Sequence, residues 1–127
     1  MSWIPTYSLE ESIKRLHGIG YRQAEATTAA PHAWPYYLGE KRREDIKECL
    51  KKYEMKFSAV VPYIGGDPGC NLASPDLEER QWTIQYFKDV VDVAVSFSAP
   101  LVPCMVGWVL VLFGKDRKEA WETAEKV

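Results

Sequence analysis

The strongest constraint on the fold of this chain is the order of segments between residues 56 and 106. Residues 56–61 (KFSAVV) form a short run rich in side chains that suit a buried, pleated strand. Residues 65–69 (GGDPG) end that run, because glycine and proline favour turns over regular structure. Residues 101–106 (LVPCMV) form a second apolar run. With a helix between them, the two runs predict a right-handed parallel strand–helix–strand unit.

The segment between these two strands predicts a long amphipathic helix. Ser74 is expected to be its N-cap, because a serine side chain accepts a hydrogen bond from a backbone N–H of the first turn. Pro75 suits the first helical position, because the N–H that proline lacks would have no partner there. Apolar residues then recur at intervals of three, four and three, which places them on one helical face. They are Ile84, Phe87, Val91 and Ala94.

Near the N-terminus, a first helix is predicted to begin after Ser8. Ser8 and Glu11 have the spacing of a capping box, in which two side chains cap the helix start reciprocally. Gly18 is expected to end this helix in a left-handed conformation. Residues 18–20 (GIG) resemble part of a dinucleotide-binding loop, but that loop follows a strand and these residues follow a helix. The apolar stripe of the helix consists of Leu9, Ile13 and Leu16.

The remaining segments complete an alternating order of strands and helices. Residues 21–26 are a weak strand by composition, and residues 31–37, which are aromatic and bounded by prolines, predict an ordered loop. Residues 40–53 predict a second amphipathic helix, and residues 115–127 a last one. Residues 3–7, directly before the first helix, are too short to assign alone. Strands and helices that alternate in this way predict an α/β architecture.

Two sheet arrangements are compatible with a chain of 127 residues, a length that is typical of one domain. One is an open, doubly wound sheet of four strands. The other is the first half of a (β/α)₈ barrel, since a whole barrel typically needs about 250 residues. Helix placement distinguishes the two, because helices cover both faces of an open sheet but only the outside of a barrel.

Composition argues against a general nucleic-acid-binding protein. The net charge is −2, whereas a general nucleic-acid binder is expected to carry a basic excess. Basic residues do cluster at positions 41–43 and 51–52, but acidic residues interleave with them. This pattern is typical of a solvated helix face with ion pairs between successive turns.

The cysteines favour an intracellular, cytoplasmic protein with reduced thiols. Cys49, Cys70 and Cys104 are odd in number and widely spaced, and they form no CxxC pair or zinc-ligand pattern. The N-terminal residues show no basic start followed by a long apolar run, so we expect no signal peptide. Residues 99–113 are apolar but shorter than the roughly 20 residues needed to span a bilayer, and we expect no membrane partner.

Several short segments, in this order and spacing, resemble one family across nearly the whole chain. The chain is similar to the sugar phosphate isomerase/epimerase family, the xylose-isomerase-like TIM barrels that also include type-IV apurinic endonucleases. No single motif is diagnostic, and the resemblance lies in the ordered set. The set consists of residues 6–9 (TYSL), 20–21 (GY) with Glu25, 31–34 (PHAW), 71–76 (NLASPD) and 99–102 (APLV).

The resemblance implies a fold of four consecutive β/α units of a (β/α)₈ TIM barrel, a half-barrel with a parallel curved sheet and outer helices over residues 1–127. Family members bind a divalent metal (Mn, Mg, Co or Zn) through carboxylates and a histidine at the ends of later strands. We therefore expect a metal in a complete family member but no metal ligands in this chain. The sequence departs from the family at residues 104–108 (CMVGW), which lack a histidine, and at the polar residues 22–24 (RQA).

In a (β/α)₈ barrel, functional residues lie at the C-terminal ends of the strands and in the loops that follow. Glu25 is the candidate catalytic residue, because a carboxylate within a short strand must face a polar environment or be costly to bury. Its carboxylate would transfer a proton or accept a hydrogen bond from a hydroxyl group of the sugar. The alternative is that Glu25 is a surface carboxylate on an edge strand. The rule selects Tyr7, Glu25, His32, Trp34, Asp67, Asn71 and Trp108.

Aromatic and histidine side chains at these positions are candidates for binding the sugar. Trp34 and Trp108 could form an apolar wall under a sugar ring, and His32 could hydrogen-bond its oxygens, although each is also compatible with ordinary packing. Asp67 and Asn71 favour turn geometry over catalysis. The candidate substrate-binding residues are Tyr7, His32, Trp34 and Trp108.

A complete family member would isomerise or epimerise a sugar or sugar phosphate by removing the proton next to a carbonyl group. This chain supplies one acid/base candidate of that kind, so we expect it to be inactive as a fragment or to need a partner half. Open sheet edges favour self-association. The main alternative is a stand-alone, non-catalytic α/β domain that binds a small molecule or a protein. A fragment of an apurinic endonuclease is disfavoured by the acidic balance.

Overall fold

The computed structural model describes residues 6–63, 70–105, 107 and 117–126. The chain divides into two compact units. The sheet unit comprises residues 1–63 and 89–103, and the C-terminal unit comprises residues 64–88 and 104–127. Several predicted features lie outside the described residues: most of the segment 3–7, the glycine-rich turn 65–69 with Asp67, and Trp108.

The sheet unit contains two parallel strands, β1 (Gln23–Thr27) and β2 (Lys56–Val61). The predicted strand at residues 56–61 is confirmed, whereas β1 begins and ends slightly later than the predicted 21–26. In the register, Gln23 lies opposite Lys56 and Thr27 opposite Val61, with an irregularity between Ala24 and Glu25. Ser58, the extra residue at this bulge, donates a hydrogen bond from its hydroxyl to the carbonyl of Ala24 at 3.2 Å.

The predicted fourth strand is wrong over residues 101–105, which form no strand. One backbone hydrogen bond does join this segment to β2, from Val60 N to Leu101 O at 3.0 Å. Pro103 has no N–H to donate, so a continued ladder would lack a donor in its middle. Within the described residues, the sheet therefore has two strands, and the next segment only touches its edge.

Helix α1 (Leu9–Gly18) begins as predicted, because the Ser8 hydroxyl accepts a hydrogen bond from Glu11 N at 3.2 Å. Its end differs from the prediction. The helix includes Gly18 and is followed by Ile19 at φ −96°, and the left-handed residue is Gly20 at φ +101°. The amide of Gly20 donates to the carbonyl of His17 at 3.0 Å, which closes the last turn.

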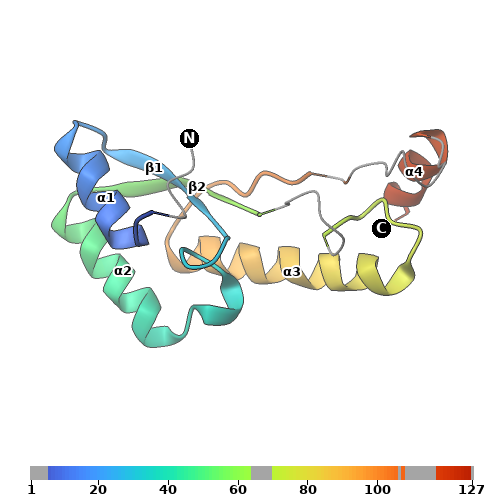
Figure 1. Cartoon of the computed structure of the whole chain (residues 1–127), viewed down its shortest axis with the longest axis horizontal. Coiled ribbons are helices and arrows are strands. Elements are labelled where there is room, and N and C mark those ends of the chain that lie inside the picture. Colours follow the sequence, from blue (N-terminus) through green and yellow to red (C-terminus); the bar gives the residue numbers. More distant parts are fainter. Residues whose placement is uncertain (1–5, 64–69, 106, 108–116, 127) are drawn as a thin grey trace. The chain divides into compact units, whose positions relative to one another are not determined.

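Helix α2 (Glu40–Lys52) confirms the predicted second helix and follows a 3₁₀ turn, η1 (Pro35–Tyr37). Its buried residues are Ile46 and Leu50. Figure 1 shows α2 beside α1 next to the two strands. A two-pronged ion pair joins the helices, because both terminal nitrogens of Arg42 bond to the carboxylate of Glu10, one of them at 2.9 Å.

Helix α3 (Leu77–Ser96) begins later than predicted. Its first turn is capped by the carboxylate of Asp76, which accepts hydrogen bonds from Glu78 N at 2.8 Å and Glu79 N at 3.5 Å. Ser74 instead accepts from Asp76 N at 3.1 Å and shapes the turn before the helix.

The buried face of α3 also differs from the prediction. Val91 is 47% exposed, and the buried stripe runs through Thr83, Tyr86, Val90 and Val93. Thr83 was not predicted to lie on the buried face because it is polar, but its hydroxyl donates a hydrogen bond to Glu79 O at 2.7 Å within the helix. A satisfied threonine can therefore take a core position. The last helix, α4 (Arg117–Ala124), lies within the predicted segment 115–127.

Burial differs between the two strands, because β2 has buried residues on both faces, Ala59 at 2% and Val60 at 0% exposure, whereas β1 is buried on one face. Ala26 of β1 is 1% exposed, whereas its neighbour Glu25 and the first residue, Gln23, are exposed. Since successive side chains of a strand point to opposite faces, β1 is covered on one face and open on the other. The aromatic rings of Phe57 and Phe97 meet edge to face on the covered side, with centroids 5.5 Å apart.

Candidate functional site

The C-terminal ends of β1 and β2 are fastened together by Thr28, which follows β1 directly and is fully buried. Its backbone N–H donates to Val61 O at 2.9 Å, and its hydroxyl donates to the same oxygen at 3.2 Å. The hydroxyl also accepts a hydrogen bond from Tyr63 N at 2.9 Å. These hydrogen bonds join the C-terminal end of β1 to the end of β2 and to the start of the loop that follows β2.

His32 and Tyr7, both predicted site residues, lie together at this end of the sheet unit. His32 is 7% exposed, and its Nε2 lies 2.7 Å from the carbonyl oxygen of Tyr7. Because a carbonyl oxygen only accepts, Nε2 carries the proton and donates this bond. The bond connects the loop after β1 to the residue that precedes the cap of α1. His32 thus has a structural contact, and its predicted contact with a sugar stays a prediction.

The ring of Tyr7 is held from α1 as well. The Arg15 guanidinium carbon lies 4.1 Å from the centroid of the Tyr7 ring, within the range of a cation–π interaction. Arg15 Nε also bonds to Glu11 Oε1 at 2.8 Å. Tyr7 is therefore fixed through its backbone by the β1 loop and through its ring by the first helix.

Trp34 packs against a second aromatic ring in the loop that follows β1. Its ring meets that of Tyr36 edge to face, with centroids 5.6 Å apart. The neighbouring Tyr37 is 72% exposed, and Tyr63, after β2, is 48% exposed. Trp34 was predicted from the sequence as a site residue and these tyrosines were not, although residues 36–37 fall within the predicted loop. Tyr37 and Tyr63 thus present exposed aromatic rings in the loops that follow the two strands.

Glu25 is not brought into contact with His32 or Tyr7. It lies within β1, opposite Ala59 in the register, and its side chain is exposed on the open face of the strand. Its carboxylate makes no hydrogen bond or ion pair with a residue that the structure describes. Exposure to water removes any burial cost for this carboxylate, and its acid/base role stays a prediction.

Asn71, in the C-terminal unit, serves turn geometry as predicted. Its side-chain oxygen accepts a hydrogen bond from Ala73 N at 3.0 Å, which forms an Asx turn. Gly107 lies against this turn at φ +131°, and a Cβ atom there would be 2.2 Å from Asn71 Oδ1. Trp108, the remaining predicted binding residue, lies outside the described residues.

The described residues do not fit a divalent metal. Within residues 6–63, 70–105, 107 and 117–126, no three side chains of His, Cys, Asp and Glu lie close enough together to hold one. Burial raises the pKa of the thiols of Cys49, Cys70 and Cys104, that of Cys70 to about 11, with Glu79 adding to the effect on Cys70. Raised pKa values keep these thiols protonated, unlike metal-binding or nucleophilic cysteines.

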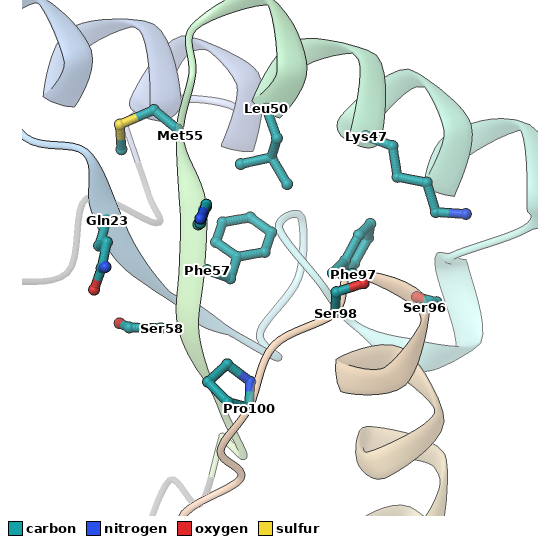
Figure 2. Close-up of a pocket in the computed structure, with 11 residues that line it drawn as sticks. Gln23, Lys47, Leu50, Met55, Phe57, Ser58, Ser96, Phe97, Ser98 and Pro100 are labelled. Atoms are coloured by element: carbon teal, nitrogen blue, oxygen red, sulfur yellow. The ribbon is translucent and has the colours of Figure 1, made fainter.

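A cavity of about 720 Å³ lies at the opposite, N-terminal end of the strands. It is bounded by the starts of β1 and β2, the second half of α2 and the end of α3, all within the sheet unit. Figure 2 shows Phe57, Phe97 and Leu50 directed into the space between these elements. None of the predicted site residues lines it.

Comparison with known proteins identifies the family. A family model described as xylose isomerase-like TIM barrel matches residues 13–127. The chain belongs to the xylose isomerase-like TIM barrel family, and the predicted family is confirmed. None of the described helices is both long and apolar enough to cross a membrane.

Solved structures agree on the fold. The chain is similar to D-psicose 3-epimerase from Clostridium cellulolyticum H10 crystallised with D-tagatose, with 16% identity and a TM-score of 0.77 over 95% of this chain and 42% of that chain. It is also similar to a D-psicose 3-epimerase whose structure was determined in the presence of D-fructose, with 10% identity and a TM-score of 0.75. That match covers 95% of this chain and 40% of the epimerase chain. The chain thus spans about two-fifths of their length. No curated protein matches it significantly.

Proposed function

We propose that this chain forms the first four β/α units of a sugar isomerase or epimerase and carries part of its sugar-binding rim. The observation that carries the proposal is the fold match, which covers 95% of this chain but only 42% of a D-psicose 3-epimerase. The one-sided burial of β1 supports it as well, because a barrel strand is covered by helices on its outer face only.

The proposed rim lies at the C-terminal ends of β1 and β2. Tyr7, His32 and Trp34 contact the sugar ring and its hydroxyl groups. Glu25 removes or returns the proton next to the sugar carbonyl. The hydrogen bonds of Thr28 support the arrangement by fixing the two strand ends, and the His32–Tyr7 bond supports it by joining two loops of the rim.

Turnover requires groups that the described residues do not supply. A divalent metal would stabilise the enediolate oxygen in a complete enzyme of this kind, but the described residues do not fit one. We therefore propose that the 127 residues alone bind a ketohexose weakly, without isomerising it. Activity would need a second half-barrel supplied by another polypeptide segment.

Self-association is part of the same proposal. The open face of β1 presents the polar side chains of Gln23 and Glu25, so it is not an apolar surface that drives association. The edge of β2 is the better candidate for pairing with a second copy, because the segment at residues 101–105 forms no strand beside it, although Val60 N donates one hydrogen bond to Leu101 O there. Light scattering at increasing protein concentration tests this, and a molar mass that stays at 14.5 kDa would refute it.

Binding is tested by isothermal titration calorimetry with D-fructose and D-tagatose. Trp34→Ala is expected to weaken binding at least roughly threefold, the loss of about 0.7 kcal/mol. The matched control Trp121→Ala removes a tryptophan that is 58% exposed in the C-terminal unit and is expected to leave affinity unchanged. Turnover is assayed separately by chromatography with added Mn²⁺, Mg²⁺, Co²⁺ or Zn²⁺. Conversion of either sugar by the isolated chain would refute the proposed inactivity.

The alternative is a non-catalytic α/β domain that binds a small molecule or a protein. The exposed position of Glu25 and its lack of a partner among the described residues favour this reading over catalysis by the chain alone. A Glu25→Gln variant separates the two functions once a complementing half is found. Catalysis predicts loss of turnover with sugar affinity retained, with Glu48→Gln on α2 as the matched control.

A further inference from the structure

The cavity at the N-terminal ends of the strands lies away from the proposed sugar rim. Parallel strands have their C-terminal ends at one edge, where the rim lies, whereas the cavity is lined by Gln23 and Lys56, the first residues of β1 and β2. Its volume of about 720 Å³ is within the range of sites that hold small organic molecules. A ligand here would therefore be separate from the sugar.

The inner wall of the cavity is apolar. Phe57 is 3% exposed and Phe97 is 7% exposed, and their rings meet at 81° with centroids 5.5 Å apart. Leu50 and Met55 complete this wall and are also buried. A wall of this kind favours the hydrocarbon part of a ligand and offers few partners to the hydroxyl groups of a sugar.

The charged residues that line the cavity are both lysines, Lys47 of α2 and Lys56 of β2, and no lining residue is acidic. Lys47 pairs with Glu44 at 2.7 Å, but the two side chains are 42% and 65% exposed, so this pair is weak. Lys56 makes no ion pair with any described residue. The mouth of the cavity thus carries positive charge that a bound anion would neutralise.

Two of the three serines of the lining, Ser58 and Ser96, add little to anion binding. The hydroxyl of Ser58 donates to Ala24 O at 3.2 Å, and that of Ser96 donates to Val93 O at 2.7 Å. Because these protons are already used within the protein, the hydroxyls present lone pairs to the cavity. Recognition of an anion therefore depends on the lysines, with Ser98 as the remaining serine of the lining.

We propose that this cavity binds a small amphipathic carboxylate, separately from any sugar. The apolar body of the ligand packs against Phe57 and Phe97, and its carboxylate pairs with the ammonium group of Lys56. Lys47 adds a second positive charge. A neutral molecule of the same shape keeps the apolar contacts but loses the ion pair, so charge and shape contribute separately to affinity.

The test is an NMR titration of the full 127-residue chain with 4-phenylbutyrate and, in parallel, with the neutral 4-phenyl-1-butanol. Saturable shifts are expected at the amides of residues 55–58 and 96–98, with the carboxylate bound about three- to fivefold more tightly, the effect of one exposed ion pair. Lys56→Met is expected to remove this preference while affinity for the alcohol stays unchanged. The matched control Lys41→Met, at an exposed position of α2 outside the cavity, is expected to preserve it.

Three results would overturn the proposal. One is the absence of saturable shifts up to the solubility limit of the carboxylate. Another is equal affinity for the acid and the alcohol in the unmodified chain. The third is a shift pattern confined to the C-terminal strand ends around Thr28 and His32. If Lys56→Met fails to fold, Lys47→Met replaces it, with a smaller loss of preference for the acid expected and an unchanged preference counting against the proposal.

Discussion

Thr28 offers the most direct perturbation of the strand ends that support the proposed rim. A Thr28→Val variant keeps the shape of the side chain but removes the hydroxyl, which donates to Val61 O at 3.2 Å and accepts from Tyr63 N at 2.9 Å. Because the residue is fully buried, water cannot replace these bonds without a rearrangement. The variant therefore isolates the contribution of the hydroxyl.

The expected loss of stability is about 2–3 kcal/mol, from two hydrogen bonds worth about 1 kcal/mol each and the partial desolvation of Tyr63 N–H. The matched variant Thr28→Ser keeps the hydroxyl and loses one buried methyl group, which costs about 1 kcal/mol. Since Val61 O keeps its bond from the Thr28 backbone N–H, it does not add a further unpaired group.

Urea denaturation followed by circular dichroism measures both variants. With an m-value of about 2 kcal/mol/M, Thr28→Val is expected to lower the unfolding midpoint by about 1 M and Thr28→Ser by about half of that. The slopes are expected to stay equal to that of the unmodified chain. If Thr28→Val is as stable as the unmodified chain, or more stable than Thr28→Ser, the hydroxyl does not fasten the strand ends.

Three further predictions concern other parts of the chain. Gly107→Ala is expected to destabilise the C-terminal unit by about 1–3 kcal/mol, because φ is +131° at this residue and a Cβ atom would lie 2.2 Å from Asn71 Oδ1. Thermal unfolding of the variant measures the loss of stability. The pKa of the Cys70 thiol is raised to about 11 from 9.0, so at pH 8 this thiol is expected to react with iodoacetamide about a hundredfold more slowly than an unperturbed thiol. Mass spectrometry of the iodoacetamide-treated protein measures the rate, and a rate equal to that of glutathione would contradict the prediction. Arg42→Met is expected to cost about 1–2 kcal/mol by removing the two-pronged pair with Glu10 that joins α2 to α1, and a double-mutant cycle with Glu10→Gln measures the coupling.

Local sequence patterns were sufficient for the elements whose formation depends on their own residues. The strand at residues 56–61 and the start of α1 at Ser8 were predicted correctly, because composition and capping chemistry act over a few positions. The start of α3 was missed because Ser74 and Asp76 are both good caps, and only the formed turn selects Asp76. The left-handed residue after α1 was misplaced for a similar reason, since Gly18 and Gly20 compete for it.

Contacts between distant segments could not be predicted in this way. Thr28 was not selected because its partners, Val61 and Tyr63, lie more than 30 positions away, and a threonine after a strand carries no local signal of such bonds. The topological rule did place Tyr7 and His32 at the same end of the sheet, although it could not give the bond between them. The missing strand at residues 101–105 shows the opposite error, because apolar composition outweighed the lack of a donor at Pro103.

The position at which the chain binds a sugar decides whether the C-terminal strand ends form a sugar-binding rim. The measurement is an NMR titration of the isolated 127-residue chain with D-fructose, read at backbone amides. Saturable shifts are expected at residues 28–34 and 61–63, around the C-terminal strand ends, with residues 55–58 unaffected. Saturable shifts at residues 55–58 alone, or none up to the highest sugar concentration, would contradict it.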